Sequence, residues 1–240
     1  MTKKPSLSIV IPCYNEEQRM KIAINGAVRA AEASGRETEV IFIDDGSTDD
    51  TYRIGCELIS GDDRISMVKR PHQGKGGAIK AGVALCSGDV IVTADADWSM
   101  PPEQVVRFLE VLDKHSTSQI VIASREIDGS MRYGEPTTRH IIGRVFNVFV
   151  RVIILPDIQD SQCGFKAYRD QAAKTLFADL NTTGWAFDVE ILAKAKRLGM
   201  PINEIPIDWR YDGDSRLNTT RDALTMTLAV IKLRLKMRRD

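Results

Sequence analysis

Short, almost continuous apolar segments alternate with helical patterns along the first half of the chain, and this alternation most strongly constrains the fold. Five segments have the length and apolar content of buried strands: residues 7–11, 39–43, 65–68, 90–94 and 120–124. Helical patterns separate them, over residues 16–34, 49–59, 75–86 and 102–113. Strands that are buried on both faces and joined by helices are typical of a parallel sheet. We therefore predict an α/β fold, with a doubly wound, mostly parallel sheet and helices on both faces.

Polar side chains follow four of the five predicted strands, at the point where each strand ends. These clusters are Tyr14, Asn15 and Glu16; Asp44 and Asp45; Asp95 and Asp97; and Arg125. The carboxyl ends of parallel strands meet at one edge of a sheet, and open α/β sheets bind their ligands there. The sequence therefore predicts an active site at this edge.

Asp95 and Asp97 place two carboxylates two residues apart, directly after the apolar segment 90–94. Hard divalent cations prefer oxygen ligands, and Mg²⁺ is typically held by one or two carboxylates together with substrate phosphates. The pair therefore predicts a metal site, although an acidic pair at a strand end can also do no more than cap the next helix.

The glycine-rich segment 73–77, QGKGG, is similar to a phosphate-binding loop but lacks the spacing of the known ones. A Walker A loop needs Ser or Thr after Gly-Lys, and the dinucleotide fingerprint needs a glycine where Ile79 stands. These mismatches argue against an ATPase and against an NAD enzyme. A glycine-rich turn that opens a helix can still bind phosphate through its backbone N–H groups, with Lys75 as a nearby charge.

Charge and cysteine content restrict the partners and the compartment. The chain has 33 basic and 33 acidic residues, and a protein without a basic excess is not expected to bind nucleic acid. The four cysteines form no CxxC pair, which argues against a zinc site and fits a reducing compartment. We find no signal peptide, no transmembrane stretch and no hydrolase signature. We expect a cytoplasmic protein, or a peripheral one on the cytosolic face of a membrane.

Two amphipathic helices are expected in the second half. After Arg139, residues 140–155 are apolar apart from Gly143 and a single polar stripe at helical spacing, formed by His140, Arg144, Asn147 and Arg151. This pattern fits either a buried core helix or a helix in a membrane interface. Residues 218–240 repeat the theme, and residues 216–240 contain seven basic and two acidic side chains. Such a basic end indicates an anionic partner such as a membrane surface, or only a solvated helix end.

Five motifs follow one another in an order and at intervals that resemble the inverting GT-A glycosyltransferases of family 2. They are PCYNE at 12–16, DDGSTD at 44–49, GKG at 74–76, DAD at 95–97 and ASR at 123–125. Two later segments, DSQCGFK at 160–166 and WAFDVE at 185–190, are similar to the dolichyl- or polyprenyl-phosphate sugar synthases, most of all the dolichyl-phosphate β-glucosyltransferases. The resemblance implies a GT-A catalytic domain over 1–217, with the 139–155 helix inside it, and a basic amphipathic helix over 218–240.

The resemblance also implies how the nucleotide-sugar donor is bound. The residues concerned are Pro12, Tyr14, Glu16 and Asp44, which would line the base and ribose pocket, and Asp45 and Lys75, which would lie near the nucleotide. Asp95 and Asp97 would hold Mg²⁺ or Mn²⁺ on the diphosphate and offset the charge on the leaving group.

Basic residues would bind the acceptor. The resemblance implies that Arg125 and Arg139, on either side of the loop 126–138, bind the phosphate of the lipid, because a guanidinium fork suits phosphate. Arg216 would be a further basic contact near the diphosphate, and Asp188 would orient the acceptor or assist proton removal. A phosphate monoester is largely dianionic at neutral pH, so its attack needs no strong base. From the residues alone, Arg139 and Asp188 could instead begin helices, and Arg216 could be a surface charge.

The leading hypothesis is a metal-dependent inverting transferase that moves a hexose, glucose from UDP-glucose, onto polyprenyl or dolichyl phosphate at a membrane surface. GDP-mannose as the donor and a soluble sugar as the acceptor are alternatives within the same chemistry. A non-catalytic nucleotide-binding protein on a GT-A fold is the alternative from another class, although every charged residue that the transfer needs is present.

Overall fold

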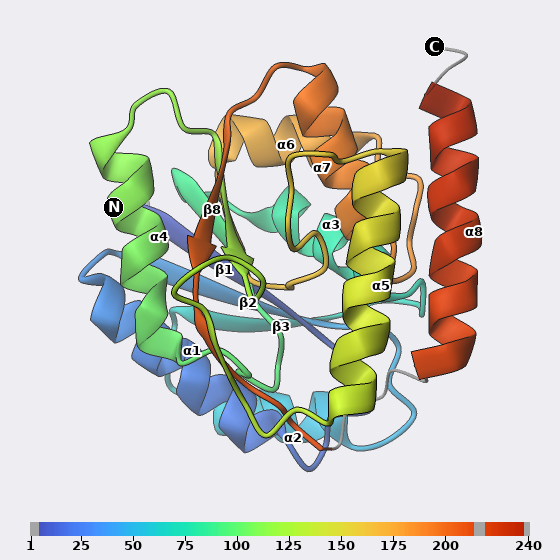
Figure 1. The fold of residues 1–240 in the computed structure, drawn as a ribbon. Helices are drawn as coiled ribbons and strands as arrows, with labels where there is room; N and C mark the ends of the chain where they lie inside the picture. Colours follow the sequence, from blue (N-terminus) through green and yellow to red (C-terminus); the bar gives the residue numbers. More distant parts are fainter. Residues whose placement is uncertain (1–4, 214–218, 238–240) are drawn as a thin grey trace.

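The computed structural model describes residues 5–213 and 219–237 (Figure 1). The strands are β1 Leu7–Cys13, β2 Thr38–Asp44, β3 Ile65–Lys69, β4 Val90–Thr93, β5 Ile120–Ser124, β6 Met131–Tyr133, β7 Lys166–Arg169, β8 Ile202–Pro206 and β9 Asp208–Arg210. The helices are α1 Met20–Ser34, α2 Thr51–Leu58, α3 Lys75–Leu85, α4 Val105–Lys114, α5 Thr137–Ile153, α6 Asp170–Ala178, α7 Phe187–Arg197 and α8 Thr219–Met237. A 3-10 turn, Pro102–Gln104, precedes α4.

Seven strands form one sheet in the order β3-β2-β1-β4-β7-β5-β8, and β6 pairs with β9 in a second, two-stranded sheet. Within the large sheet only β7 runs antiparallel to its neighbours, β4 and β5. Strands β2 and β4 lie on opposite sides of β1, so the strand order reverses there. The loops at such a switch point diverge and leave a crevice at the carboxyl ends of the strands. The predicted α/β fold is confirmed.

Helices cover both faces of the sheet, and each face has its own core (Figure 1). Side chains of β1 alternate between the two: Leu7, Ile9 and Ile11 pack with α1 and α4, whereas Val10 packs with α3, α6 and α7. Both faces of the strand are therefore buried, which explains the nearly continuous apolar segments of the sequence.

All five predicted strands are present, with shifted ends. Strand β1 continues through Pro12 to Cys13, two residues beyond the predicted end at residue 11. Pairing between β1 and β4 stops at Val10 and Thr93, so one side of β1 is without a ladder neighbour at Pro12, where a missing N–H is tolerated. Helix α1 begins at Met20 rather than near residue 16, because a turn at Glu16 comes first.

Helix α5 lies at the surface of the molecule, beside α8 (Figure 1). Only Asn147 and Val150 of α5 are buried, so a buried core helix is wrong. Val145 is 65% exposed and Val152 is 78% exposed, so much of the apolar arc faces outward while Asn147 of the polar stripe faces inward. In the part of the chain that the structure describes, no helix is long and apolar enough to cross a membrane.

Candidate active site

A cleft of about 600 Å³ opens at the carboxyl ends of β1, β4 and β5. It brings together most of the predicted site residues: Pro12, Tyr14, Glu16, Asp45, Lys75, Asp95, Asp97, Arg125, Arg139 and Asp188. Asp44 is fully buried and is not among the residues that line the cleft. Arg216 lies outside the described residues. Each of the four predicted strand-end clusters therefore contributes to the cleft, although Asn15 and Asp44 are not among the residues that line it.

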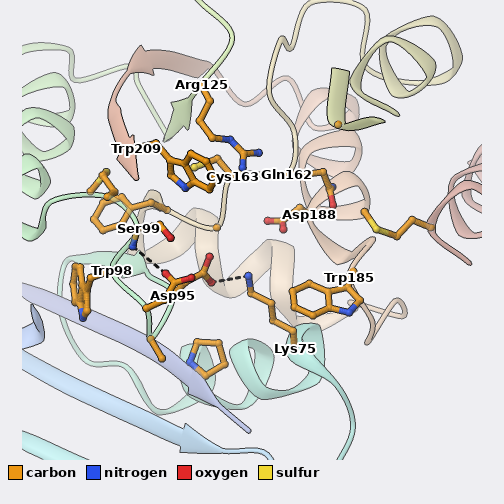
Figure 2. A pocket seen from close by; sticks show the side chains of 18 of the residues that line it. Lys75, Asp95, Trp98, Ser99, Arg125, Gln162, Cys163, Trp185, Asp188 and Trp209 are labelled. Carbon is orange, nitrogen blue, oxygen red and sulfur yellow. Dashed lines mark hydrogen bonds and ion pairs between the residues drawn. The ribbon is translucent and has the colours of Figure 1, made fainter. Parts of the chain in front are cut away.

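Asp95 lies across the cleft from Asp188 (Figure 2), and Asp97 also lines the cleft. Nζ of Lys75 is 2.6 Å from Oδ1 of Asp95. Burial opposes ionisation of Asp95, but this ammonium outweighs it and keeps the pKa of Asp95 below its ordinary value. Burial, and then the negative charge of Asp95, raise the pKa of Asp97, whose Oδ1 accepts a hydrogen bond of 2.9 Å from the N–H of Ser99.

The donor chemistry of this pair fits a hard divalent cation. Both side chains are carboxylates, and their mutual repulsion raises the pKa of Asp97, which a cation between them would relieve. The described residues include no cluster of three or more His, Cys, Asp or Glu side chains able to hold a metal. A cation on Asp95 and Asp97 would therefore take its other ligands from substrate phosphates or water.

The glycine-rich segment serves chain packing and not phosphate binding. The N–H groups of Gly76 and Gly77 donate to the carbonyl oxygen of Thr183, at 2.7 and 3.3 Å. The N–H groups of Gln73 and Gly74 donate to the Asp45 carboxylate, at 2.9 and 2.8 Å. Protein acceptors therefore already occupy four of the five backbone N–H groups of residues 73–77, which argues against a phosphate cradle in this segment.

Asp45 and Asp44, adjacent in sequence, occupy different surroundings. Asp45 organises the loop that precedes α3, and its Oδ2 also lies 2.9 Å from Nδ1 of His72. The His72 ring stacks on Tyr14 at a centroid distance of 4.3 Å, which joins the end of β1 to the loop between β3 and α3. Asp44 Oδ1 accepts a hydrogen bond from the N–H of Ser47, whereas its buried Oδ2 has no hydrogen-bond partner among the described residues.

Arg125 enters the cleft from the end of β5 (Figure 2), and Asp160 holds its guanidinium. Its Nε and Nη2 donate to the two oxygens of Asp160, at 2.7 and 2.9 Å. Burial opposes ionisation of Asp160, but the arginine outweighs it and lowers the pKa of this carboxyl to about 2. The pairing fixes the direction of the guanidinium and leaves Nη1 as the nitrogen not engaged by Asp160.

Ion pairs within the loop 126–138 hold it together, because Arg132 contacts the carboxylates of Glu126 and Glu135. Nε of Arg132 also donates a hydrogen bond of 3.1 Å to the carbonyl oxygen of Arg125, just after β5. Arg139 lies in the first turns of α5, with its guanidinium 4.8 Å from the centre of the Tyr211 ring. Arg125 and Arg139 therefore both line the cleft, on either side of a clamped loop.

Asp188 lies in the first turn of α7, but its side chain is buried, so it is not simply an exposed start of the helix. Its Oδ1 accepts a hydrogen bond of 2.6 Å from Nζ of Lys166, which is itself fully buried on β7. Burial raises the pKa of Asp188, and Lys166 opposes this. One oxygen is thus fixed by a lysine while the carboxylate borders the cleft.

The sequence profile of glycosyl transferase family 2 matches residues 8–177. The chain belongs to this family. A dolichyl-phosphate beta-glucosyltransferase of Dictyostelium discoideum is 30% identical over 243 residues, covering 96% of this chain and 74% of the relative. The human protein of that name is 31% identical over 247 residues, covering 96% and 75%. The predicted enzyme class, a nucleotide-sugar-dependent glycosyltransferase, is confirmed.

Solved structures support the GT-A architecture of this family 2 enzyme. Glucosyl-3-phosphoglycerate synthase of Mycobacterium tuberculosis, in complex with Mn²⁺, UDP-glucose and phosphoglyceric acid, superposes with a TM-score of 0.71. That match has 21% sequence identity and covers 96% of this chain and 79% of the other. At this identity the likeness supports the fold alone.

Sequence reasoning gave no role to several residues that shape the cleft of this family 2 enzyme. Asp160 and Lys166 stand at the two ends of the segment 160–166, which was recognised only as a family motif. They hold Arg125 and Asp188, but their contacts span 35 and 22 residues of sequence, with no periodic signal. Trp98 and His72 also line the cleft and were not predicted. Trp98 directly follows the acidic pair in the sequence, and His72 directly precedes the glycine-rich segment. This proximity is the signal by which both residues could have been predicted.

Proposed function

We propose that the enzyme transfers glucose from UDP-glucose to dolichyl or polyprenyl phosphate, with inversion, at a membrane surface. One observation carries this: a single cleft has an acidic pair on one wall and arginines on another, and one of its sides is α5, a helix whose outer face is apolar and exposed. Relatives about 30% identical over most of the chain are named dolichyl-phosphate beta-glucosyltransferases, which supports the acceptor and the sugar.

The donor would be held at the ends of β1, β2 and β4. Pro12, Tyr14 and Glu16 line this part of the cleft, whereas Asp44 is fully buried outside its lining and is assigned no contact to the base. Asp95 and Asp97 would hold Mg²⁺ or Mn²⁺, which supplies charge stabilisation to the leaving diphosphate when bound. Mn²⁺ and UDP-glucose occur together in the solved synthase of the same fold.

The acceptor phosphate would be bound by Arg125 and Arg139. Asp160 fixes the Arg125 guanidinium, and this preorganisation lowers the entropy that phosphate binding costs. A phosphate oxygen then attacks the anomeric carbon from the face opposite the leaving group, and its charge makes a strong base unnecessary. Asp188, fixed by Lys166, would orient the reacting groups. Arg216 remains a candidate contact to the diphosphate.

The exposed apolar face of α5 and the neighbouring helix α8 would contact the membrane. Ile141, Val145, Val148 and Val152 of α5 are exposed, as are Leu228, Ile231 and Leu235 of α8. The basic side chains of residues 216–240 would attract anionic headgroups, and apolar burial would add to this. We propose peripheral attachment to the cytosolic face, with the cleft opening beside the lipid, and the exposed apolar side chains of both helices support this proposal.

The test is transfer of radiolabelled sugar from UDP-glucose, and separately from GDP-mannose, to a short polyprenyl phosphate, with Mn²⁺ or with EDTA. We expect metal-dependent lipid-linked glucose, reduced at least about a hundredfold in Asp97→Asn, because removal of one transition-state charge contact costs about 3 kcal/mol. A parallel reaction with 3-phosphoglycerate tests a soluble acceptor. Labelled glycerate product without labelled lipid would contradict the lipid acceptor, and labelled mannose would contradict the donor.

A further inference from the structure

Trp98 follows the acidic pair directly and has an unusual backbone conformation. Its φ of 46° lies in the left-handed region, which is unfavourable for a bulky side chain. Asn15 is the other non-glycine residue with positive φ in the described chain, and asparagine adopts this region readily. A conformation of this kind persists only where surrounding contacts hold it.

Those contacts come from α1, which is not part of the strand end that carries the acidic pair. Nε1 of Trp98 donates a hydrogen bond of 2.9 Å to the carbonyl oxygen of Ala23. Gly26 leaves room for the ring, because a Cβ at that position would lie 2.2 Å from Cδ1 and 2.3 Å from Nε1 of Trp98. The indole therefore lies against bare helix backbone, and any side chain at Gly26 would displace it.

The turn that carries Trp98 also fixes the acidic pair (Figure 2). The N–H of Trp98 donates to the carbonyl oxygen of Asp95 at 3.2 Å, and the N–H of Ser99 donates to Oδ1 of Asp97 at 2.9 Å. On its other side the indole packs against Phe165, with ring centroids 6.3 Å apart. The direction of both carboxylates is thus coupled to where the indole is anchored.

We propose that Trp98 is a positioning residue: its indole, anchored on α1 through Gly26, holds the left-handed turn that directs Asp95 and Asp97 into the cleft. The inference rests on the proposed function, in which this pair holds a divalent cation on the donor diphosphate. The role needs no contact between Trp98 and the substrate. It makes Gly26 important for metal binding, although it lies on a helix outside the cleft lining.

Binding of Mn²⁺ in the presence of UDP, followed by the electron paramagnetic resonance of free Mn²⁺, tests the proposal in Gly26→Ala, Trp98→Gly and the double variant. We expect Mn²⁺ to bind about tenfold more weakly in each single variant. Glycine adopts φ of 46° freely, so Trp98→Gly removes the anchor without adding strain. The double variant should bind Mn²⁺ no more weakly than Trp98→Gly, because the two substitutions remove the same contact between the indole and α1.

Two further variants make the result specific. Ile22→Ala, on the exposed side of α1, is the matched control and should bind Mn²⁺ like the wild type. Trp98→Phe keeps a ring but loses the hydrogen bond to Ala23, and should weaken Mn²⁺ binding about fivefold. This variant tests the proposal even if the Gly26 variants do not fold. Unchanged Mn²⁺ affinity in a folded Gly26→Ala or Trp98→Phe variant, or additive losses in the double variant, would overturn the proposal and leave the proposed function intact. A wild type that binds no Mn²⁺ with UDP would overturn both.

Discussion

At the residue scale, the cleft depends on buried charges whose partners come from distant parts of the chain. Arg125 and Asp160 form such a pair, and Lys166 and Asp188 form a second. Removal of one partner leaves the other charge uncompensated, which costs several kcal/mol of folding free energy. The direction of each functional side chain is therefore tied to the stability of the fold.

The Arg125–Asp160 pair predicts a pH dependence of stability. Because the folded pKa of Asp160 is lowered to about 2 from 3.8, its contribution is present above pH 4 and is lost as the pH falls through about 2. The shift corresponds to about 2 kcal/mol in the free energy of unfolding. We expect Asp160→Asn to flatten the decline between pH 4 and pH 2, and to destabilise the protein at pH 7 by roughly 3 kcal/mol.

Urea unfolding at pH 7, 4 and 2.5 measures both effects. Asp113→Asn, which breaks an ion pair with Arg36 in which the Asp113 side chain is 62% exposed, is the matched control and should change stability by less than about 1 kcal/mol. Equal pH profiles for the wild type and Asp160→Asn would show that Asp160 does not supply this dependence.

At the scale of the elements, whether a strand or helix could be predicted from the sequence depended on how its side chains are buried. Strand β1 was predictable because both of its faces are buried and its sequence is almost wholly apolar. Strand β7 was not, because its sequence KAYR has no apolar run, and the buried ammonium of Lys166 is held there by Asp188 and by the carbonyl oxygen of Cys163. The helical period of α5 was correct, but the pattern could not tell which side meets the protein.

The exposed side of α5 predicts lipid binding. We expect the triple variant Val145→Ser, Val148→Ser, Val152→Ser to fold normally, because all three side chains are exposed. Its binding to anionic vesicles should weaken roughly a hundredfold, since burial of each valine contributes about 1 kcal/mol or more. Co-sedimentation with phosphatidylserine-containing vesicles measures this. Ile22→Ser, the same kind of change at a single residue of α1 that is 56% exposed, should bind vesicles like the wild type. A comparable loss in this control would refute an α5-specific contact.

At the scale of the whole molecule, the position of the cleft could be predicted from the sequence, but the segment that forms its far side could not. The carboxyl ends of parallel strands had to meet at one edge, so Asp95 and Arg125 could be placed together from sequence order alone. The segment 181–186 comes from the second half of the chain and closes the cleft from the far side. It docks on α3 through contacts that span about a hundred residues, as between Gly76 and Thr183. No local pattern marks such a contact.

This docking gives a last prediction, for Gly76→Ala. Alanine is the better helix former, so on propensity alone the change would stabilise α3 by up to about 1 kcal/mol. The structure predicts the reverse, because a Cβ at Gly76 would lie 2.6 Å from Cβ of Phe187 and 2.7 Å from the carbonyl oxygen of Thr182. We expect a net destabilisation of about 1–3 kcal/mol from overpacking, together with reduced transfer activity as the segment that carries Trp185 is displaced.

Urea unfolding measures the destabilisation. Gly184→Ala, in the same segment but with no atom within 4 Å of its Cβ, is the stability control and should unfold like the wild type. A Gly76→Ala variant more stable than the wild type would mean that the glycine-rich segment does not couple the two halves, and would return phosphate binding by its N–H groups to consideration.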